Sequence, residues 1–325
     1  MNLTAGVSLE YNILNKFKKQ KPIASPGKKD KTLPGRIINR GNIKFLESDS
    51  VFPHSILIPR KDMFHKHYTS SLELLYGIRD KKSEKLAASG IKDLIQLKES
   101  GHKSASEADY ILQALEKDFS SVKEVLSDRF SSSHKLLFLL LSYFNKEDLL
   151  FLDIETKSLA FETSILLIGA GYFEKDVFRV KQYTILEDAA EYEILEEFVK
   201  TFKDKKAFVT FNGRTFDVPF IDQRLSYYGI PCPGEFLSAH NFDLLHFSRN
   251  VFKNMQESFR LKEIESNILG IKRGCDIDGA EVELYYAKYL RTGDPSYLVP
   301  IIEHNTTDIE SLLILMNKIS GIWAK

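Results

Sequence analysis

The pattern of apolar and polar positions changes its period at about residue 146. Between residues 70 and 130, leucines and isoleucines recur at the three- and four-residue intervals of amphipathic helices. After residue 146, short apolar or alternating runs replace that pattern, and such runs indicate β-strands. The predicted strands cover residues 149–155, 164–171, 177–185, 207–211 and 242–245.

Predicted helices separate the later strands and continue to the end of the chain. Three adjacent strands come first, and helices over residues 187–202 and 216–228 then alternate with the fourth and fifth strands. This succession predicts an α/β domain over residues 146–325, in which helices flank a sheet of mixed strand direction.

Residues 1–60 have no regular apolar pattern and are interrupted by proline and glycine. We expect a basic flexible arm here, with at most a short strand over residues 56–58. Ten basic residues and one acid lie between residues 16 and 44, although the whole chain has 45 residues of each sign. Such an arm suits contact with a polyanion beside a carboxylate-rich body. A solvated tail without a partner is the alternative.

Residues 61–145 form the predicted helical region. The stretch that begins Leu75-Tyr76-Gly77-Ile78 and continues to Gly90 and Leu94 resembles a helix-hairpin-helix repeat. In that family a glycine-rich hairpin offers backbone N–H groups to DNA phosphates. Arg79 occupies the place of the usual second glycine, and a helical bundle without DNA contact is the alternative.

The composition is that of a globular protein without membrane spans. Hydrophobic residues make up 43% of the chain and charged residues 28%. The longest apolar run covers residues 136–144, far fewer than the roughly 20 residues that cross a bilayer. The N-terminus has no apolar core of the signal-peptide kind. We therefore expect a cytoplasmic protein; the sequence identifies no protein partner or oligomeric state.

Two carboxylates end the first strand of the α/β part. Asp153 and Glu155 are two residues apart, so a strand directs both side chains to one face. Two carboxylates beside an apolar strand are costly unless a cation neutralises them. Carboxylate oxygens are the ligands that Mg²⁺ and Mn²⁺ prefer.

Two further segments carry polar groups at defined spacing. Asp217 follows the turn after the fourth strand and falls in the first turn of a helix, where a negative charge is also stabilised without any catalytic role. His304 and Asp308 are four apart, so they share one face of the final helix. An exposed pair or a satisfied core pair is the alternative for these two.

Taken together, these motifs resemble a nuclease family. D-x-E on a first strand, N-x-x-x-F-D after a later strand and H-x-x-x-D on a final helix resemble the DEDD superfamily of 3′→5′ exonucleases. More narrowly, the chain is similar to the YprB-type ribonuclease-H-like family of bacteria over residues 146–319. The narrower resemblance also involves the stretches Leu166-Leu167-Ile168-Gly169, Asp243-Leu244-Leu245-His246, Leu261-Lys262-Glu263-Ile264-Glu265, Leu269-Gly270-Ile271 and Asp276-Ile277-Asp278-Gly279.

The resemblance implies a ribonuclease-H-like fold and a two-metal site that hydrolyses DNA or RNA. Asp153 would bridge two Mg²⁺ or Mn²⁺ ions, Glu155 and Asp308 would complete one of them, and Asp217 would hold the other. In the family the general base is a Tyr four residues before the last Asp or a His five before it.

This chain has His304 at the first of those positions and Glu303 at the second. We expect His304 to be the general base; the alternative is that it only contacts a substrate phosphate. Asn212, Arg214 and Phe216 are candidate substrate contacts, although Phe216 is equally expected in the core.

Two other functions stay open. A nuclease of the same fold can cut internally, and the helix-hairpin-helix-like stretch would suit branched or duplex DNA. A catalytically silent nucleic-acid-binding module is the other alternative. All four carboxylates are present, which counts against a silent module.

Overall fold

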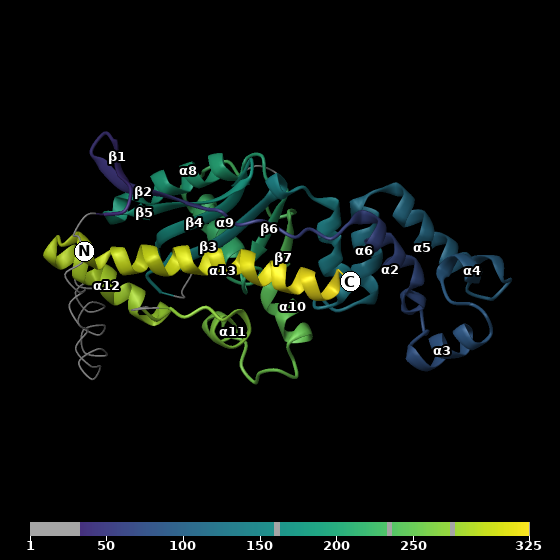
Figure 1. The fold of residues 1–325 in the computed structure, drawn as a ribbon. Coiled ribbons are helices and arrows are strands. Elements are labelled where there is room, and N and C mark those ends of the chain that lie inside the picture. The colour runs from purple at the N-terminus through teal and green to yellow at the C-terminus, as the bar shows by residue number, and fades with distance from the viewer. Residues whose placement is uncertain (1–32, 159–162, 233–235, 274–276, 325) are drawn as a thin grey trace, which may run out of the picture.

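The computed structural model describes residues 33–158, 163–232, 236–273 and 277–324 (Figure 1). The strands are β1 (Arg36–Arg40), β2 (Ile43–Phe52), β3 (Leu149–Thr156), β4 (Ile165–Glu174), β5 (Val177–Ile185), β6 (Ala207–Thr210) and β7 (His240–Asp243). The five strands expected after residue 146 are therefore all found, and β7 begins two residues earlier than the apolar run indicated.

Helices make up most of the remaining described chain. They are α2 (Lys61–Ser70), α3 (Asp80–Ala88), α4 (Leu94–Glu99), α5 (Ala105–Lys117), α6 (Phe119–Arg129), α7 (Lys135–Leu139), α8 (Glu191–Phe202), α9 (Asp217–Tyr228), α10 (Leu244–Val251), α11 (Leu261–Ile264), α12 (Gly279–Thr292) and α13 (Val299–Trp323). Short 3₁₀ turns are η1 (Leu72–Leu74), η2 (Leu140–Tyr143), η3 (Lys146–Asp148), η4 (Asp188–Ala190) and η6 (Pro295–Tyr297), and η5 (Glu265–Leu269) is a π-helical turn. No helix in the part that the structure describes is both long and apolar enough to pass through a membrane.

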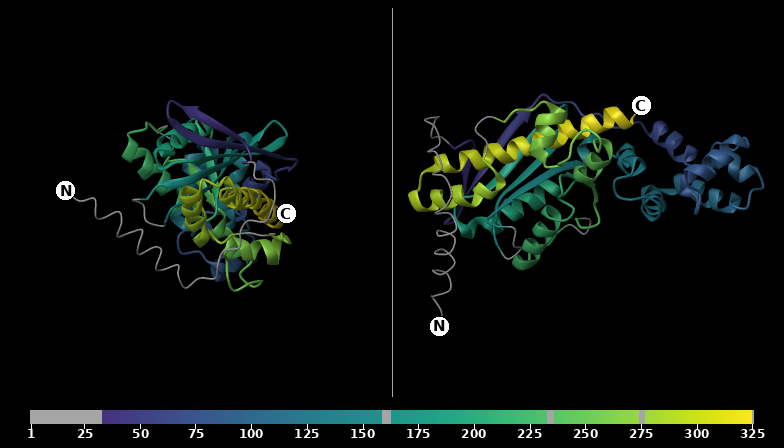
Figure 2. Two further views of the ribbon diagram at one scale, coloured as in Figure 1. Left: turned by 90° about the vertical axis from the view of Figure 1, so that its left-hand side faces the viewer. Right: turned by 90° about the horizontal axis from the view of Figure 1, so that it is seen from below.

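The strands form one mixed sheet in the order β1-β2-β5-β4-β3-β6-β7. Neighbours from β1 to β3 are antiparallel, whereas β6 and β7 run parallel to β3. Helices α8 and α9 cover one face, and the long α13 crosses the other (Figure 2). The predicted fold class, an α/β mixed sheet flanked by helices, is confirmed.

Strand β3 has side chains buried on both faces of the sheet. Leu150, Leu152 and Ile154 enter the core under α8 and α9, and Phe151 enters the core that contains α13. A strand buried on both faces reads as a continuous apolar run, which is how residues 149–152 appear in the sequence.

The prediction of a flexible arm over residues 1–60 is wrong for residues 36–52. These residues form the β1–β2 hairpin, which turns at Gly41 (φ +62°) and pairs with β5. Phe45 and Leu46 are fully buried, so the hairpin gains apolar burial that the charge pattern concealed. Residues 1–32 of the expected arm lie outside the described residues.

Two arginines of that expected basic arm are bound by acids of the protein itself. Arg36 pairs with Glu47 at 2.7 Å. Arg40 pairs with three glutamates of α8, which are Glu193, Glu196 and Glu197. Both charges are therefore paired within the protein, although the Arg36 side chain itself stays exposed.

The short strand expected over residues 56–58 is also absent from the structure. This segment is extended but makes no sheet ladder. It lies along α13 instead, where Leu57 N donates to Asn317 Oδ1 at 2.7 Å and Asn317 Nδ2 donates to Ser55 O at 2.8 Å. One side-chain amide, that of Asn317, makes the hydrogen bonds that a neighbouring strand would otherwise make.

The helical region between α2 and α7 lies at one end of the molecule, beside the C-terminus (Figure 1). Its buried side chains form one continuous cluster with the α13 face of the sheet; for example, Trp323 of α13 contacts Phe138 of α7. Within it, α3 and α4 are joined by a turn at Gly90 (φ +96°). A separate domain boundary at residue 145 and contact of this turn with DNA stay predictions.

Candidate active site

Strand β3 directs Asp153 and Glu155 to the face of the sheet that α13 covers. Their neighbours Leu152 and Ile154 point to the opposite face and pack beneath α8 and α9. Glu155 is 8% exposed, and Asp153 is half-buried. The strand thus places the side chains of Asp153 and Glu155 on one face, as their two-residue spacing predicts.

Asn305 of α13 connects the helix to β3. Its Nδ2 donates to Asp153 O at 3.1 Å and to Asp153 Oδ2 at 2.7 Å, while its Oδ1 accepts from Gln182 Nε2 at 2.8 Å. A Cβ at Gly169 would lie 2.0 Å from Asn305 Oδ1. Glycine in β4 therefore permits the helix to approach closely enough to hold the Asp153 carboxylate.

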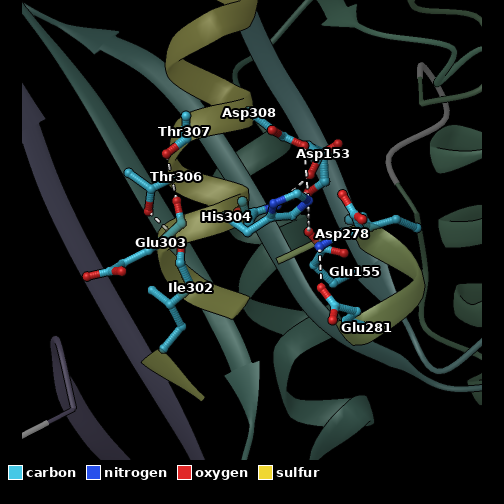
Figure 3. Close-up of polar contacts among 12 residues, drawn as sticks. Asp153, Glu155, Asp278, Glu281, Ile302, Glu303, His304, Thr306, Thr307 and Asp308 are labelled. Atoms are coloured by element: carbon cyan, nitrogen blue, oxygen red, sulfur yellow. Dashed lines mark hydrogen bonds and ion pairs between the residues drawn. The ribbon is translucent and has the colours of Figure 1, made fainter. Parts of the chain in front are cut away.

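The same helix presents His304 and Asp308 toward the carboxylates of β3 (Figure 3). His304 Nε2 lies 3.6 Å from Asp308 Oδ2 and 3.9 Å from Glu155 Oε1. Glu303 is exposed and points away from Asp153 and Asp308 (Figure 3). Glu303 is therefore no counterpart of the histidine that one branch of the exonucleases has five residues before the last Asp.

Asp217 joins the cluster as the first residue of α9. Its Oδ1 accepts the backbone N–H of Ile154 at 3.0 Å, which places its carboxylate against β3. The turn before α9 is shaped by Asn212, whose φ is +65°. Asp243 at the end of β7 holds this turn, because it accepts from Asn212 N at 2.8 Å and from Arg214 N at 3.2 Å.

The pKa shifts reflect this crowding of buried acids. Burial raises the pKa of Asp153 well above its usual range, and the charges of Asp308, Glu155 and Asp217 raise it further. Burial likewise raises the pKa of Asp217 to about 7, with a contribution from the charge of Asp243. Burial also raises the pKa of Asp308. Four carboxylates from β3, α9 and α13 thus form one electrostatic unit.

Arg273 is the cation that the protein itself places in this unit. It makes two contacts of 2.5 Å with Glu265, a 1% exposed residue that begins the π-helical turn η5. The Arg273 guanidinium also contacts Asp308 Oδ1 and lies 3.1 Å from His304 Nδ1. Its positive charge therefore partly balances the negative charge of Asp308.

The contact with Arg273 determines which nitrogen of His304 carries a proton. A guanidinium has only donors, so His304 Nδ1 must accept in this contact. Neutral His304 then carries its proton on Nε2, the nitrogen that faces Glu155 and Asp308. In this arrangement Nε2 is a hydrogen-bond donor and not a base.

A family model described as the RNase_H superfamily matches residues 150–320, which is more than half of the chain and contains all four carboxylates. The chain belongs to this superfamily. The sequence match and the mixed sheet flanked by helices thus agree that this chain has an RNase H-like fold.

Among similar proteins of this superfamily is the uncharacterized protein YprB of Bacillus subtilis (strain 168). It is 30% identical over 203 residues, which are 61% of this chain and 48% of YprB. The chain thus spans about half the length of this relative. Among solved structures, the family B DNA polymerase of the archaeon Pyrobaculum calidifontis matches with a TM-score of 0.40 and 18% identity, over 51% of this chain and 24% of the polymerase.

The carboxylate oxygens of this RNase H-superfamily site are donors of the kind that bind a divalent metal. In the described part of the chain, no three His, Cys, Asp or Glu side chains already stand as a set of metal ligands. Carboxylates that raise one another's pKa are nevertheless what a divalent cation stabilises, and oxygen donors suit Mg²⁺ or Mn²⁺. The residues therefore fit the metal dependence that is general among nucleases of this superfamily.

The expected substrate contacts lie around the turn before α9. Asn212 and Arg214 are exposed, and their backbone N–H groups are held by Asp243. Phe216 is half-buried and packs on Phe220 with ring centroids 5.4 Å apart, a core contact. Asn212 and Arg214 remain candidates for contact with substrate.

Several residues of the site were given no role from the sequence, although Asp243 and Glu265 lie in stretches that carry the family resemblance. Asp243 is the last residue of β7, whose sequence His-Asn-Phe-Asp is mostly polar, so the strand pattern gave no strong signal for its role. Asn305 adjoins His304 and gave a weak signal. Arg273 and Glu265 do not share a helix or strand, because η5 ends at Leu269, so only the chain path after η5 brings them together.

Proposed function

We propose that this protein is a metal-dependent 3′→5′ exonuclease that hydrolyses phosphodiester bonds of DNA or RNA. The observation that supports this proposal best is the gathering of Asp153, Glu155, Asp217 and Asp308 from three separate elements around one buried site. A structural role would not require four acids that destabilise one another.

In the proposed mechanism Asp153, Glu155, Asp217 and Asp308 would hold two Mg²⁺ or Mn²⁺ ions through their carboxylate oxygens. When bound, such ions activate water and stabilise the leaving 3′ oxygen. Asn305 orients Asp153 by donating to its Oδ2, and the Ile154 N–H orients Asp217.

His304 is the proposed general base, provided that Arg273 leaves its Nδ1. With Arg273 in place, Nε2 keeps its proton and can donate to a phosphate oxygen of the substrate. With Arg273 turned away to Glu265 alone, the proton can reside on Nδ1, and Nε2 can then accept one from water. These two roles predict different pH dependence, because only a base must be unprotonated for turnover.

The test is cleavage of 5′-labelled and 3′-labelled DNA and RNA, single-stranded and duplex, with Mn²⁺ or Mg²⁺. The proposal predicts a 5′-labelled ladder that shortens stepwise, immediate release of the 3′ label as a mononucleotide, and no product with EDTA or in Asp153→Asn. Discrete internal cuts would favour an endonuclease of the same fold. Binding without any cleavage would favour a silent nucleic-acid-binding module.

A further inference from the structure

A cavity of about 480 Å³ lies between helix α6 and the sheet edge formed by β6 and β7. The helical region contributes Lys123, Ser127 and Phe130 to its lining. The α/β part contributes Arg214 from the turn before α9, and His240 and Asn241 from β7. Figure 1 shows α6 beside β7. The rings of Phe119 in α6 and His240 in β7 pack edge-on, with their centroids 5.5 Å apart.

The charge of this cavity has one sign. Its lining contains Lys123 and Arg214 but neither Asp nor Glu. Within the described chain neither of these two side chains forms an ion pair, whereas Lys206, directly before β6, pairs with Asp148 at 2.8 Å. Two cations therefore share a cavity without a protein anion, an arrangement that a bound anion would stabilise.

The pKa shifts of Lys123 and His240 show that the basic groups of the lining lie close together. Burial lowers the pKa of Lys123, and the charge of Arg214 lowers it further. Burial, followed by the charges of Lys123 and Arg214, lowers the pKa of His240 to about 3. His240 is therefore neutral at pH 7 and adds a polar ring without adding charge.

The rest of the lining combines an apolar wall with neutral polar groups, among them Ser127, Ser132 and Ser238. Leu237 is 64% exposed, and Phe130, Pro219 and Val218 complete an apolar wall. The buried Nδ2 of Asn241 has no hydrogen-bond acceptor in the part of the chain that is described. A cavity of several hundred Å³ that combines an apolar wall with a few polar groups is typical of small-ligand and nucleotide sites.

We infer that this cavity binds one nucleotide, with its phosphate between Lys123 and Arg214 and its base against the apolar wall. The nucleotide is part of the substrate strand or a free mononucleotide, because both present the same phosphate and base. Arg214 lies three residues before Asp217, and its backbone is held by Asp243, so a nucleotide here connects the helical region to the segment that carries the active site. The strand form of this inference rests on the proposed function; the free-nucleotide form does not.

The test uses the full chain in EDTA, where binding is measured without cleavage. Fluorescence anisotropy with a 5′-labelled single-stranded oligonucleotide compares wild type with Lys123→Met, which keeps the length of the side chain and removes its charge. We expect about tenfold weaker binding, and a slope of log Kd against log salt that falls by about 0.7 for the one lost phosphate contact. Lys123→Arg should restore both. Lys117→Met, which removes an exposed lysine of α5 outside the cavity, is the matched control and should bind as wild type does.

Competition by AMP and dAMP separates the two sources of the nucleotide. If AMP or dAMP displaces the oligonucleotide from wild type but not from Lys123→Met, the cavity binds a free nucleotide. If neither displaces it, while the slope of log Kd against log salt still depends on Lys123, the cavity binds a nucleotide of the strand. Unchanged affinity and slope in Lys123→Met, or an equal loss in Lys117→Met, would overturn the inference. Lys123-dependent binding without cleavage activity would instead refute the proposed function and leave the nucleotide site standing.

Discussion

Replacement of Asp217 by asparagine should stabilise the metal-free protein, although it removes a proposed metal ligand. Asp217 is 5% exposed, and its Oδ1 accepts the Ile154 N–H. Asparagine keeps an oxygen for that hydrogen bond and removes the negative charge. The variant therefore isolates the cost of holding this carboxylate ionised beside its neighbours.

The size of the effect follows from the pKa of Asp217. Folding raises it from 3.8 to about 7, roughly three pH units, and each unit corresponds to about 1.4 kcal/mol. The folded state binds the proton more tightly than the unfolded state, so wild-type stability falls as pH rises from about 4 to 7 and levels off above 7. The advantage of Asp217→Asn should thus be near zero at pH 4 and approach a ceiling of about 4 kcal/mol at pH 8.

Urea denaturation in EDTA at several pH values between 4 and 8 measures this difference in the free energy of unfolding. Mn²⁺ should reverse the order, because binding to the folded state stabilises wild type more than the variant. A difference that does not change with pH, or a variant less stable than wild type at pH 8 in EDTA, would refute the reasoning.

Three further predictions follow from the same contacts. His304→Ala should lower turnover by about a hundredfold; an unchanged rate would exclude a direct role. Arg273→Ala leaves Glu265 and Asp308 without their buried cation, so urea denaturation in EDTA should show a loss of about 3–5 kcal/mol, with Arg273→Lys in between; wild-type stability in Arg273→Ala would contradict the balancing role. Deletion of residues 1–32 should weaken nucleic-acid binding and flatten its salt dependence, and unchanged binding would show that these residues do not contribute.

Much of the fold could be predicted because its signals are local. The run at residues 149–155 and the alternation at 177–185 identify strands by their period alone. The β1–β2 hairpin was missed because lysines and prolines dominate its surroundings, and its apolar residues become meaningful only against β5. A short apolar run at residues 56–58 indicated a strand that α13 replaces with side-chain amide contacts.

The site could be predicted only in part, for a related reason. Asp153, Glu155, His304 and Asp308 have spacings that one strand and one helix convert directly into a shared face. The Arg273 contacts depend on the chain path after η5, which no local period encodes. The tautomer of His304 depends on Arg273 in turn, so its chemistry was not readable from the His-to-Asp spacing.

Whether the four carboxylates bind metal can be measured by electron paramagnetic resonance of Mn²⁺. Wild type, Asp153→Asn and Asp49→Asn, a control on β2 of the same sheet, are titrated with Mn²⁺ under identical conditions. We expect up to two bound ions in wild type and in Asp49→Asn, and loss of that binding in Asp153→Asn. No Mn²⁺ bound to wild type, or equal binding in Asp153→Asn, would contradict this expectation.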